Sequence, residues 1–182
     1  MLENVLNIEG NIIECGSDRC GTSVIMANYL KKRGIDKRIY ALDLFGGGFE
    51  VEELQEERSQ GLTEATDQMF RYNSHDYVKN KIERLGLEEI IIPVKGSFKD
   101  TLPHINSTFC LCLIDCDLRK SMVYSAETVW PKLSNNGVML FDDYGSSQYR
   151  GVKIVVDAFV KKYGHEISKH TLLNGLYSVT KN

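Results

Sequence analysis

Short apolar segments alternate with amphipathic segments along most of this 182-residue chain. That alternation favours a parallel sheet with helices on both faces, because parallel neighbours need a crossover connection and a helix usually provides it. The strand segments are almost continuously apolar, as expected for strands that are covered on both faces. We expect strands at 11–14, 38–42, 89–94, 109–114 and 137–141 and helices at 23–33, 76–85, 121–133 and 151–163.

The end of the chain departs from this alternation. Two β-rich segments, 166–172 and 176–180, are separated by Asn174-Gly175, a strong signal for a tight hairpin. The sequence therefore predicts an α/β, Rossmann-like fold with a seven-stranded, mostly parallel sheet and one antiparallel strand in a C-terminal hairpin. The polar stretch 46–71 has no clear apolar period and is interpreted as a mobile loop over the site or as a surface insertion.

Composition and charge narrow the function classes. The length suits one domain over residues 1–182, and 22 Lys and Arg against 25 Asp and Glu give a net charge of −3 with no basic concentration, so nucleic acid is a disfavoured partner. The apolar runs are too short to span a bilayer, so no membrane association is expected.

The five cysteines are an odd set in a chain large enough for a core of its own, which favours reduced thiols and a cytoplasmic location. A zinc site is disfavoured because Cys110 and Cys112 have a single residue between them.

A glycine-bearing turn follows the first predicted strand. Glu14 ends the apolar segment, and Gly16 and Gly21 lie between it and the first predicted helix. Glycines in such a turn allow a ligand to approach the backbone closely. The three-glycine GxGxxG pattern of dinucleotide-binding proteins is missing, which disfavours NAD. An ordinary strand-to-helix turn remains an alternative explanation of this motif alone.

Asp43 ends the second predicted strand. A carboxylate in that place can accept both hydroxyls of a ribose, because its two oxygens match two adjacent donors. Together with the glycine-bearing turn, it indicates a cofactor that contains adenosine.

Four more carboxylates follow two later strands. Asp115 and Asp117 follow the segment 109–114, and Asp142 and Asp143 follow the segment 137–141. Because the carboxyl ends of parallel strands converge on the ligand crevice, these acids are expected to meet and to repel one another unless a cation or a proton intervenes. Mg²⁺ prefers such oxygen ligands. The alternative is that Asp142 and Asp143 cap a turn or a helix start.

The spacing of the first pair suggests a division of roles. Asp115 and Asp117 would point the same way from an extended strand end, so that one could bind the metal and the other could reach the substrate. We therefore assign Asp115, Asp142 and Asp143 to Mg²⁺ and Asp117 to general-base catalysis.

An ordered series of segments resembles the macrocin O-methyltransferase (TylF) family of class I S-adenosylmethionine-dependent methyltransferases. The stretch GSFKDTLP at 96–103 is the most specific part of the resemblance, which runs from about residue 12 to the end of the chain. The other matching segments are DLFGG at 43–47, DCDL at 115–118, FDDYG at 141–145 and GVK at 151–153.

The resemblance implies a fold, a reaction and a set of site residues. It implies Mg²⁺ at Asp115, Asp142 and Asp143, a base at Asp117, and methylation of a hydroxyl on a small-molecule acceptor that contains a sugar or similar polyol. The chain is expected to lack the N-terminal helical extension of the family. The resemblance is also compatible with a homo-oligomer. A catechol-type O-methyltransferase and a non-catalytic cofactor-binding remnant remain alternatives. The residues that the resemblance assigns to S-adenosylmethionine are Glu14, Gly16, Ser17, Gly21, Ser23, Asp43, Ser97 and Asp115.

Overall fold

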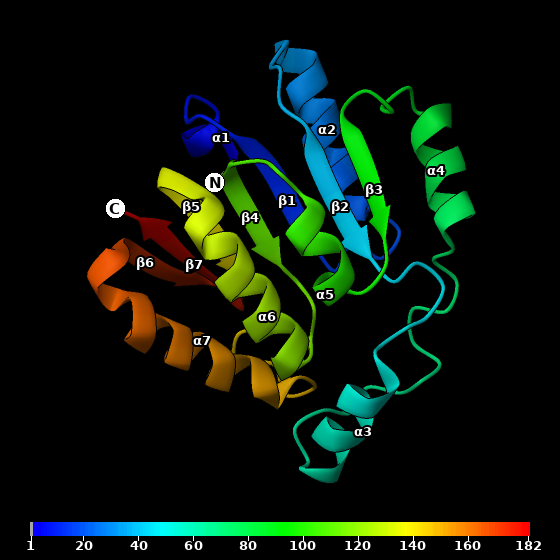
Figure 1. Ribbon diagram of the computed structural model, residues 1–182, viewed down its shortest axis with the longest axis vertical. Helices are drawn as coiled ribbons and strands as arrows, with labels where there is room; N and C mark the ends of the chain where they lie inside the picture. The colour runs from blue at the N-terminus through cyan, green and yellow to red at the C-terminus, as the bar shows by residue number, and fades with distance from the viewer. Residues whose placement is uncertain (1) are drawn as a thin grey trace.

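A computed structural model describes residues 2–182, and their strands form one mixed sheet in the order β3-β2-β1-β4-β5-β7-β6 (Figure 1). β1, β2, β3, β4 and β5 are mutually parallel, and β7 runs antiparallel to both of its neighbours. The expected sheet, with one antiparallel strand in a terminal hairpin, is confirmed. The strands are β1 (Asn11–Cys15), β2 (Ile39–Asp43), β3 (Ile91–Lys95), β4 (Phe109–Ile114), β5 (Leu133–Phe141), β6 (Ile167–Leu173) and β7 (Leu176–Lys181).

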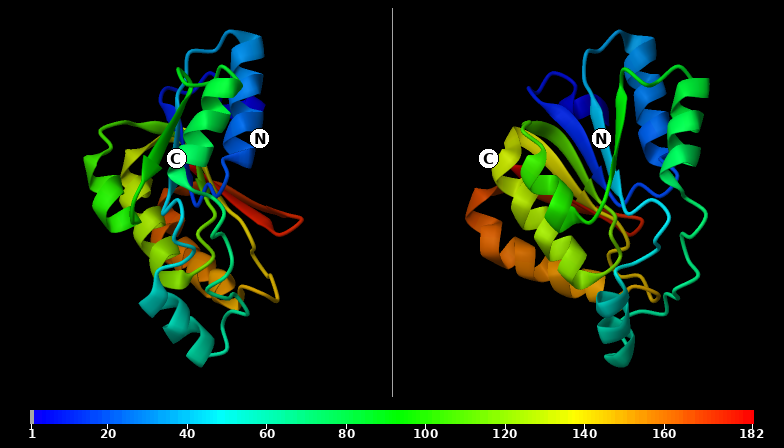
Figure 2. Two further views of the ribbon diagram at one scale, coloured as in Figure 1. Left: turned by 90° about the vertical axis from the view of Figure 1, so that its right-hand side faces the viewer. Right: turned by 45° about the vertical axis from the view of Figure 1, so that its right-hand side comes forward.

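Helices cover both faces of the sheet (Figure 2). One face carries α1 (Leu2–Val5), α2 (Gly21–Arg33) and α4 (His75–Arg84), and the other carries α5 (Phe98–Thr101), α6 (Arg119–Val129) and α7 (Arg150–Tyr163). The helix α3 (Val51–Ser59) covers neither face and lies beyond the carboxyl ends of the strands, at the bottom of Figure 1. Three short 3₁₀ helices complete the structure at Leu102–His104, Trp130–Lys132 and Gly164–Glu166.

The sheet divides the core into two layers. Ile12 packs in the layer beneath α2 and α4, whereas the next residue, Ile13, packs in the layer beneath α6 and α7. This division follows from the strand geometry, in which successive side chains point to opposite faces. All six residues of β4 are buried, which explains its unbroken apolar sequence.

The hairpin turn has the conformation that its residues favour. Asn174 and Gly175 both have positive φ, 49° and 82°. Two-residue turns of this kind need positive φ at both positions and fit the twist of the paired strands.

Three expected elements differ from the structure. The strand expected at 137–141 already begins at Leu133, as β5. The stretch 46–71 contains the helix α3, whose buried side chains are Glu53, Leu54 and Glu57 rather than an apolar stripe. The helix expected at 121–133 ends at Val129, and a 3₁₀ turn over Trp130–Lys132 follows, because Pro131 cannot continue the α-helical hydrogen bonds.

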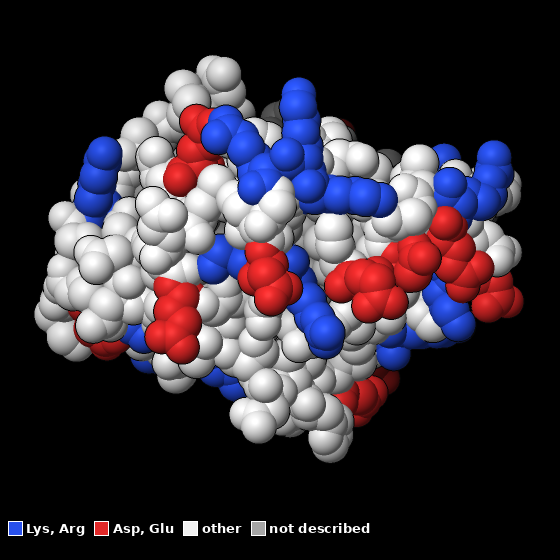
Figure 3. Space-filling view, turned by 90° about the horizontal axis from the view of Figure 1, so that it is seen from above, with Lys and Arg blue, Asp and Glu red and all other residues white. Residues whose placement is uncertain are grey.

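Basic and acidic side chains are intermingled on the face at the amino ends of the strands, which is viewed from above in Figure 3. Within residues 2–182, no helix is both long enough and apolar enough to cross a membrane.

Candidate active site

A cleft of about 750 Å³ lies at the carboxyl ends of the central strands. In open α/β sheets this edge is where ligands bind, because the loops that leave neighbouring strands diverge there. The wall on the sheet side consists of turns that follow β1, β2, β3, β4 and β5, and the opposite wall comes from α3 and the residues around it. Residues lining the sheet side include Gly16, Asp18, Asp43, Ser97, Asp115, Asp117 and Asp143.

The turn after β1 packs directly on the end of β4. Gly16 has a φ of +91°, and a Cβ atom there would lie 1.9 Å from the carbonyl oxygen of Asp115. Only glycine fits this position without moving the backbone. The turn is therefore pressed against the strand end that carries Asp115.

The carboxylate of Asp43 is held in a fixed orientation at the cleft. Its Oδ2 accepts a hydrogen bond from the backbone N–H of Asp18 at 2.9 Å, and its Oδ1 accepts from Phe45 N at 2.9 Å and from Asn73 Nδ2 at 3.0 Å. Burial raises the pKa of Asp43, and the two backbone donors oppose that effect. A carboxylate oriented in this way can accept hydrogen bonds from a ligand in the cleft.

Four of the residues assigned to the cofactor do not line the cleft: Glu14, Ser17 and Ser23 are buried behind the turn, and Gly21 is exposed. Ser23 Oγ donates a hydrogen bond to the buried carboxyl of Glu14, and Ser17 Oγ donates to the carbonyl of Leu42 at 3.4 Å. Burial raises the pKa of Glu14 to about 8. Gly21 begins α2. The other four, Gly16, Asp43, Ser97 and Asp115, line the cleft.

Three carboxylates meet at the ends of β4 and β5. One oxygen from each of Asp115, Asp117 and Asp143 lies within 4.8 Å of the others. Asp117 and Asp143 adopt the left-handed conformation, with φ of 65° and 56°, which non-glycine residues seldom adopt outside functional sites and tight turns. Asp142 is outside this group of three, although its charge acts on Asp115.

The electrostatics of the cluster favour a cation. Burial, followed by the charges of Asp142 and Asp143, raises the pKa of Asp115 to about 7. Burial and the charge of Asp115 also hold the pKa of Asp117 well above its usual range. The cluster therefore holds protons or needs positive charge, and its oxygen ligands fit a hard divalent ion such as Mg²⁺. Neither Asp142 nor Asp143 caps α7, which begins at Arg150 without a side-chain cap.

Sequence reasoning missed several residues at the cleft. Asn73 is almost fully buried and orients Asp43, but nothing in the sequence near it distinguishes it from any other polar loop residue. Tyr149 lines the cleft near the carboxylate cluster, and burial together with the charge of Asp117 raises the pKa of its hydroxyl. The spacing of Glu53 and Glu57, one helical turn apart in a polar stretch, was the available signal for α3.

The sequence was compared with known protein families. Residues 2–171 match the model of the macrocin O-methyltransferase (TylF) family. The chain belongs to this family. The resemblance of its motifs to the TylF family is thereby confirmed.

Two curated relatives are O-methyltransferases by name. An 8-demethyl-8-(2,3-dimethoxy-alpha-L-rhamnosyl)-tetracenomycin-C 4'-O-methyltransferase of Streptomyces olivaceus is 30% identical over 156 residues, which are 79% of this chain and 57% of that protein. A demethyldecarbamoylnovobiocin O-methyltransferase of Streptomyces niveus is 26% identical over 148 residues, which are 76% of this chain and 54% of that protein. This TylF-family chain thus spans just over half the length of these relatives.

Solved structures share the fold of this TylF-family chain. The O-methyltransferase NovP superposes with a TM-score of 0.83 at 24% identity, covering 100% of this chain and 76% of its own. The calicheamicin methyltransferase CalS11 superposes with a TM-score of 0.73 at 18% identity, covering 98% of this chain and 74% of its own. These similarities identify the class I methyltransferase fold.

Proposed function

We propose that this chain transfers a methyl group from S-adenosylmethionine to a hydroxyl of a sugar-containing small molecule, with assistance from Mg²⁺. The observation that carries the proposal is the placement of the oriented Asp43 carboxylate and the cluster of Asp115, Asp117 and Asp143 in one cleft. The first suits an adenosine ribose, and the second suits a metal and a base.

The cofactor would lie along the turns after β1, β2 and β3. Asp43 accepts hydrogen bonds from the ribose hydroxyls, and Gly16 leaves room for the cofactor next to the backbone. Ser97 and Asp115 line the same stretch of the cleft. Glu14, Ser17 and Ser23 contribute by supporting this turn from behind, and Gly21 begins the helix that follows it. S-adenosylmethionine, when bound, supplies a methyl group on a sulfonium that is ready for in-line attack.

The carboxylates of the cluster would have two different roles, metal binding and proton acceptance. Asp115, Asp142 and Asp143 hold Mg²⁺, which when bound supplies positive charge that neutralises the cluster and polarises an acceptor hydroxyl. Asp117 accepts the proton of that hydroxyl on a carboxylate oxygen. Methyl transfer would form a bond between the acceptor oxygen and the methyl carbon and break the carbon–sulfur bond, leaving S-adenosylhomocysteine, and the chain's own residues would act chiefly by positioning the two partners.

Two phenylalanine side chains on the cleft wall opposite the sheet favour an acceptor with an apolar face. Phe49 and Phe70 line the cleft and pack edge to face, with ring centroids 5.3 Å apart and an interplanar angle of 83°. Sugar rings and planar aglycones both present apolar faces that such side chains can cover. The rhamnosyl group in the name of the Streptomyces olivaceus relative favours a glycosylated acceptor. All five cysteines are free, which supports action in a reducing cytoplasm.

Methyl transfer from labelled S-adenosylmethionine tests the proposal. Purified protein is incubated with 4-nitrophenyl α-L-rhamnopyranoside or with 3,4-dihydroxybenzoate, each with Mg²⁺ and with a chelator. We expect methylation of the rhamnoside that needs Mg²⁺ and is lost in Asp117→Asn. Methylation of the catechol alone would assign the chain to the catechol-type alternative. Saturable binding of S-adenosylhomocysteine without transfer to either acceptor would favour a cofactor-binding remnant.

A further inference from the structure

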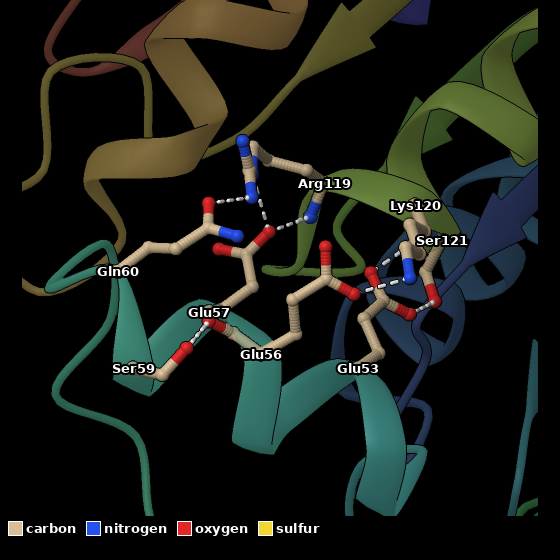
Figure 4. Close-up of polar contacts among 8 residues, drawn as sticks. All are labelled: Glu53, Glu56, Glu57, Ser59, Gln60, Arg119, Lys120 and Ser121. Carbon is tan, nitrogen blue, oxygen red and sulfur yellow. Dashed lines mark hydrogen bonds and ion pairs between the residues drawn. The ribbon is translucent and has the colours of Figure 1, made fainter.

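The helix α6 obtains its N-terminal caps from α3. Leu118 precedes α6 and has no side chain that could cap it. Instead, the backbone N–H of Arg119 donates to Glu57 Oε1 at 2.8 Å, and the N–H of Ser121 donates to Glu53 Oε1 at 2.9 Å (Figure 4). Free N–H groups in a first turn need such acceptors, and negative charge is favoured there by the helix dipole.

Glu57 is the buried member of this contact. Its side chain is 2% exposed, and Arg119 Nε donates to the same Oε1 at 2.8 Å. Its second oxygen, Oε2, is buried and has no hydrogen-bond partner among residues 2–182. A buried carboxylate oxygen in that state requires stabilisation by the charges and dipoles around it.

The unpartnered oxygen faces the start of α7. A Cβ atom on Gly151, in the first turn of α7, would lie 2.7 Å from Glu57 Oε2. Tyr149, which precedes α7, provides no side-chain cap. Glu57 therefore lies between the amino ends of two helices, and the absence of a side chain at Gly151 makes room for it there.

Both of these helices follow turns that carry the acidic cluster. Asp117 lies two residues before the first residue of α6, and Asp143 lies in the connection between β5 and α7. Both have left-handed backbone conformations, so the orientation of their side chains depends on the elements that fix the turns. The carboxylate of Glu57 accepts a hydrogen bond at the start of α6 and lies, together with the side chain of Arg119, beside Gly151 at the start of α7.

We propose that Glu57 is a positioning residue that links α3, a wall of the cleft, to the turns that carry Asp117 and Asp143. When α3 is docked, the Glu57 carboxylate fixes the first turns of α6 and α7 and thereby the orientation of the two aspartates. When α3 moves away, both turns lose this anchor. The catalytic consequence rests on the proposed methyl transfer, whereas the linkage itself does not.

Glu56 offers a matched control. It lies next to Glu57 on α3 and pairs with Lys120, but the two side chains are 40% and 60% exposed (Figure 4). Exposed pairs of this kind contribute little to stability. Glu56→Gln therefore removes the same charge from the same helix. Its contact with α6 is with the exposed side chain of Lys120 and not with a backbone N–H group of the first turn.

Hydrogen exchange without acceptor tests the linkage. In Glu57→Gln, we expect the amide of Arg119, which donates to Glu57, and the amide of Gly151, which lies beside its Oε2, to exchange at least fivefold faster than in wild type, with α2 and α4 unchanged. Glu56→Gln should exchange like wild type. Equal exchange at Arg119 and Gly151 in the two variants would overturn the proposal. If Glu57→Gln does not fold, Glu53→Gln serves instead, with faster exchange expected at residues 119–121 and none of that acceleration in Glu56→Gln.

Kinetics then separate a positioning role from a purely structural one. With 4-nitrophenyl α-L-rhamnopyranoside, Glu57→Gln should lower kcat at least tenfold while the Kd for S-adenosylhomocysteine stays within twofold. An unchanged kcat together with faster exchange would overturn the positioning role. A wild-type protein that does not methylate this probe would count against the proposed function, and the exchange result would still decide the linkage.

Discussion

Gly16 lies so close to the backbone of Asp115 that a Cβ atom would approach its carbonyl oxygen to 1.9 Å. This contact joins the turn that would hold the cofactor to the strand end that carries the acidic cluster. We expect Gly16→Ala to lower the free energy of unfolding by about 2 kcal/mol or more, because the backbone must shift and its φ of +91° is strained for alanine. Thermal or denaturant unfolding measures the change.

Gly164→Ala is the control for that substitution. Gly164 has a negative φ, and nothing lies within 4 Å of the Cβ that alanine would add. The free energy of unfolding of Gly164→Ala should stay within about 0.5 kcal/mol of the wild-type value. If Gly16→Ala were as stable as Gly164→Ala, the close packing of the two segments would be wrong.

The second prediction concerns Asp43 and the cofactor. Asp43→Asn keeps the shape of the side chain but replaces one acceptor oxygen with a donor, which opposes hydrogen bonds from ribose hydroxyls. We expect the Kd for S-adenosylhomocysteine, measured by calorimetric titration, to rise at least tenfold. Asp36→Asn, at an exposed position outside the cleft, should bind as wild type does. Equal affinities in the two variants would exclude the ribose contact.

A third prediction separates the metal ligands from the base. Asp142→Asn should weaken Mg²⁺ binding strongly if Asp142 is a ligand, because a neutral amide is a poorer ligand for a hard cation. Asp117→Asn should retain Mg²⁺ and lose methyl transfer. Calorimetric titration of Mg²⁺ into each variant measures the difference. The reverse pattern would make Asp115, Asp117 and Asp143, the three that meet in the structure, the metal site.

The sequence predicted the sheet because its signals are local. Each strand is an apolar run long enough to be buried on both faces, and Asn174-Gly175 sets the hairpin by its own conformational preferences. The gathering of acids at one edge also followed, since parallel strands bring their carboxyl ends together.

The helix α3 was missed because its burial depends on distant residues. Glu53 and Glu57 are buried on account of Ser121 and Arg119, which lie more than 60 positions further along the chain. No periodic apolar pattern predicts such a helix, because charged side chains occupy its inner face. Only the partners, which are recognisable in the folded chain, explain why these carboxylates can be buried.

The details of the acidic cluster also depend on turn geometry. Simple strand alternation expects Asp115 and Asp117 to point the same way, but Asp117 has already left the strand and is left-handed. Both side chains nevertheless reach the cleft. Which of Asp142 and Asp143 joins them is set by the left-handed turn at Asp143, and the sequence carries no simple signal for that turn.

The last prediction concerns Glu14 and pH. Burial raises the pKa of Glu14 to about 8 in the folded protein from an ordinary value near 4.5. A carboxyl group with a raised pKa binds its proton more tightly in the folded than in the unfolded chain. Its contribution to stability is therefore complete below about pH 4.5 and is lost progressively as the pH rises towards about 8.

Glu14→Gln should remove this pH dependence, because a neutral amide of the same shape cannot ionise. Between low pH and pH 7, the raised pKa of Glu14 lowers the free energy of unfolding of wild type by roughly 3 kcal/mol. The variant should therefore lose less stability than wild type between pH 5 and pH 8. Urea unfolding across that range, without cofactor or metal, measures the two slopes. Glu9→Gln, an exposed control, should follow wild type. Parallel curves for wild type and Glu14→Gln would mean that Glu14 is ionised in the fold at neutral pH and that its hydrogen bonds with Ser23 and Thr22 offset the effect of burial.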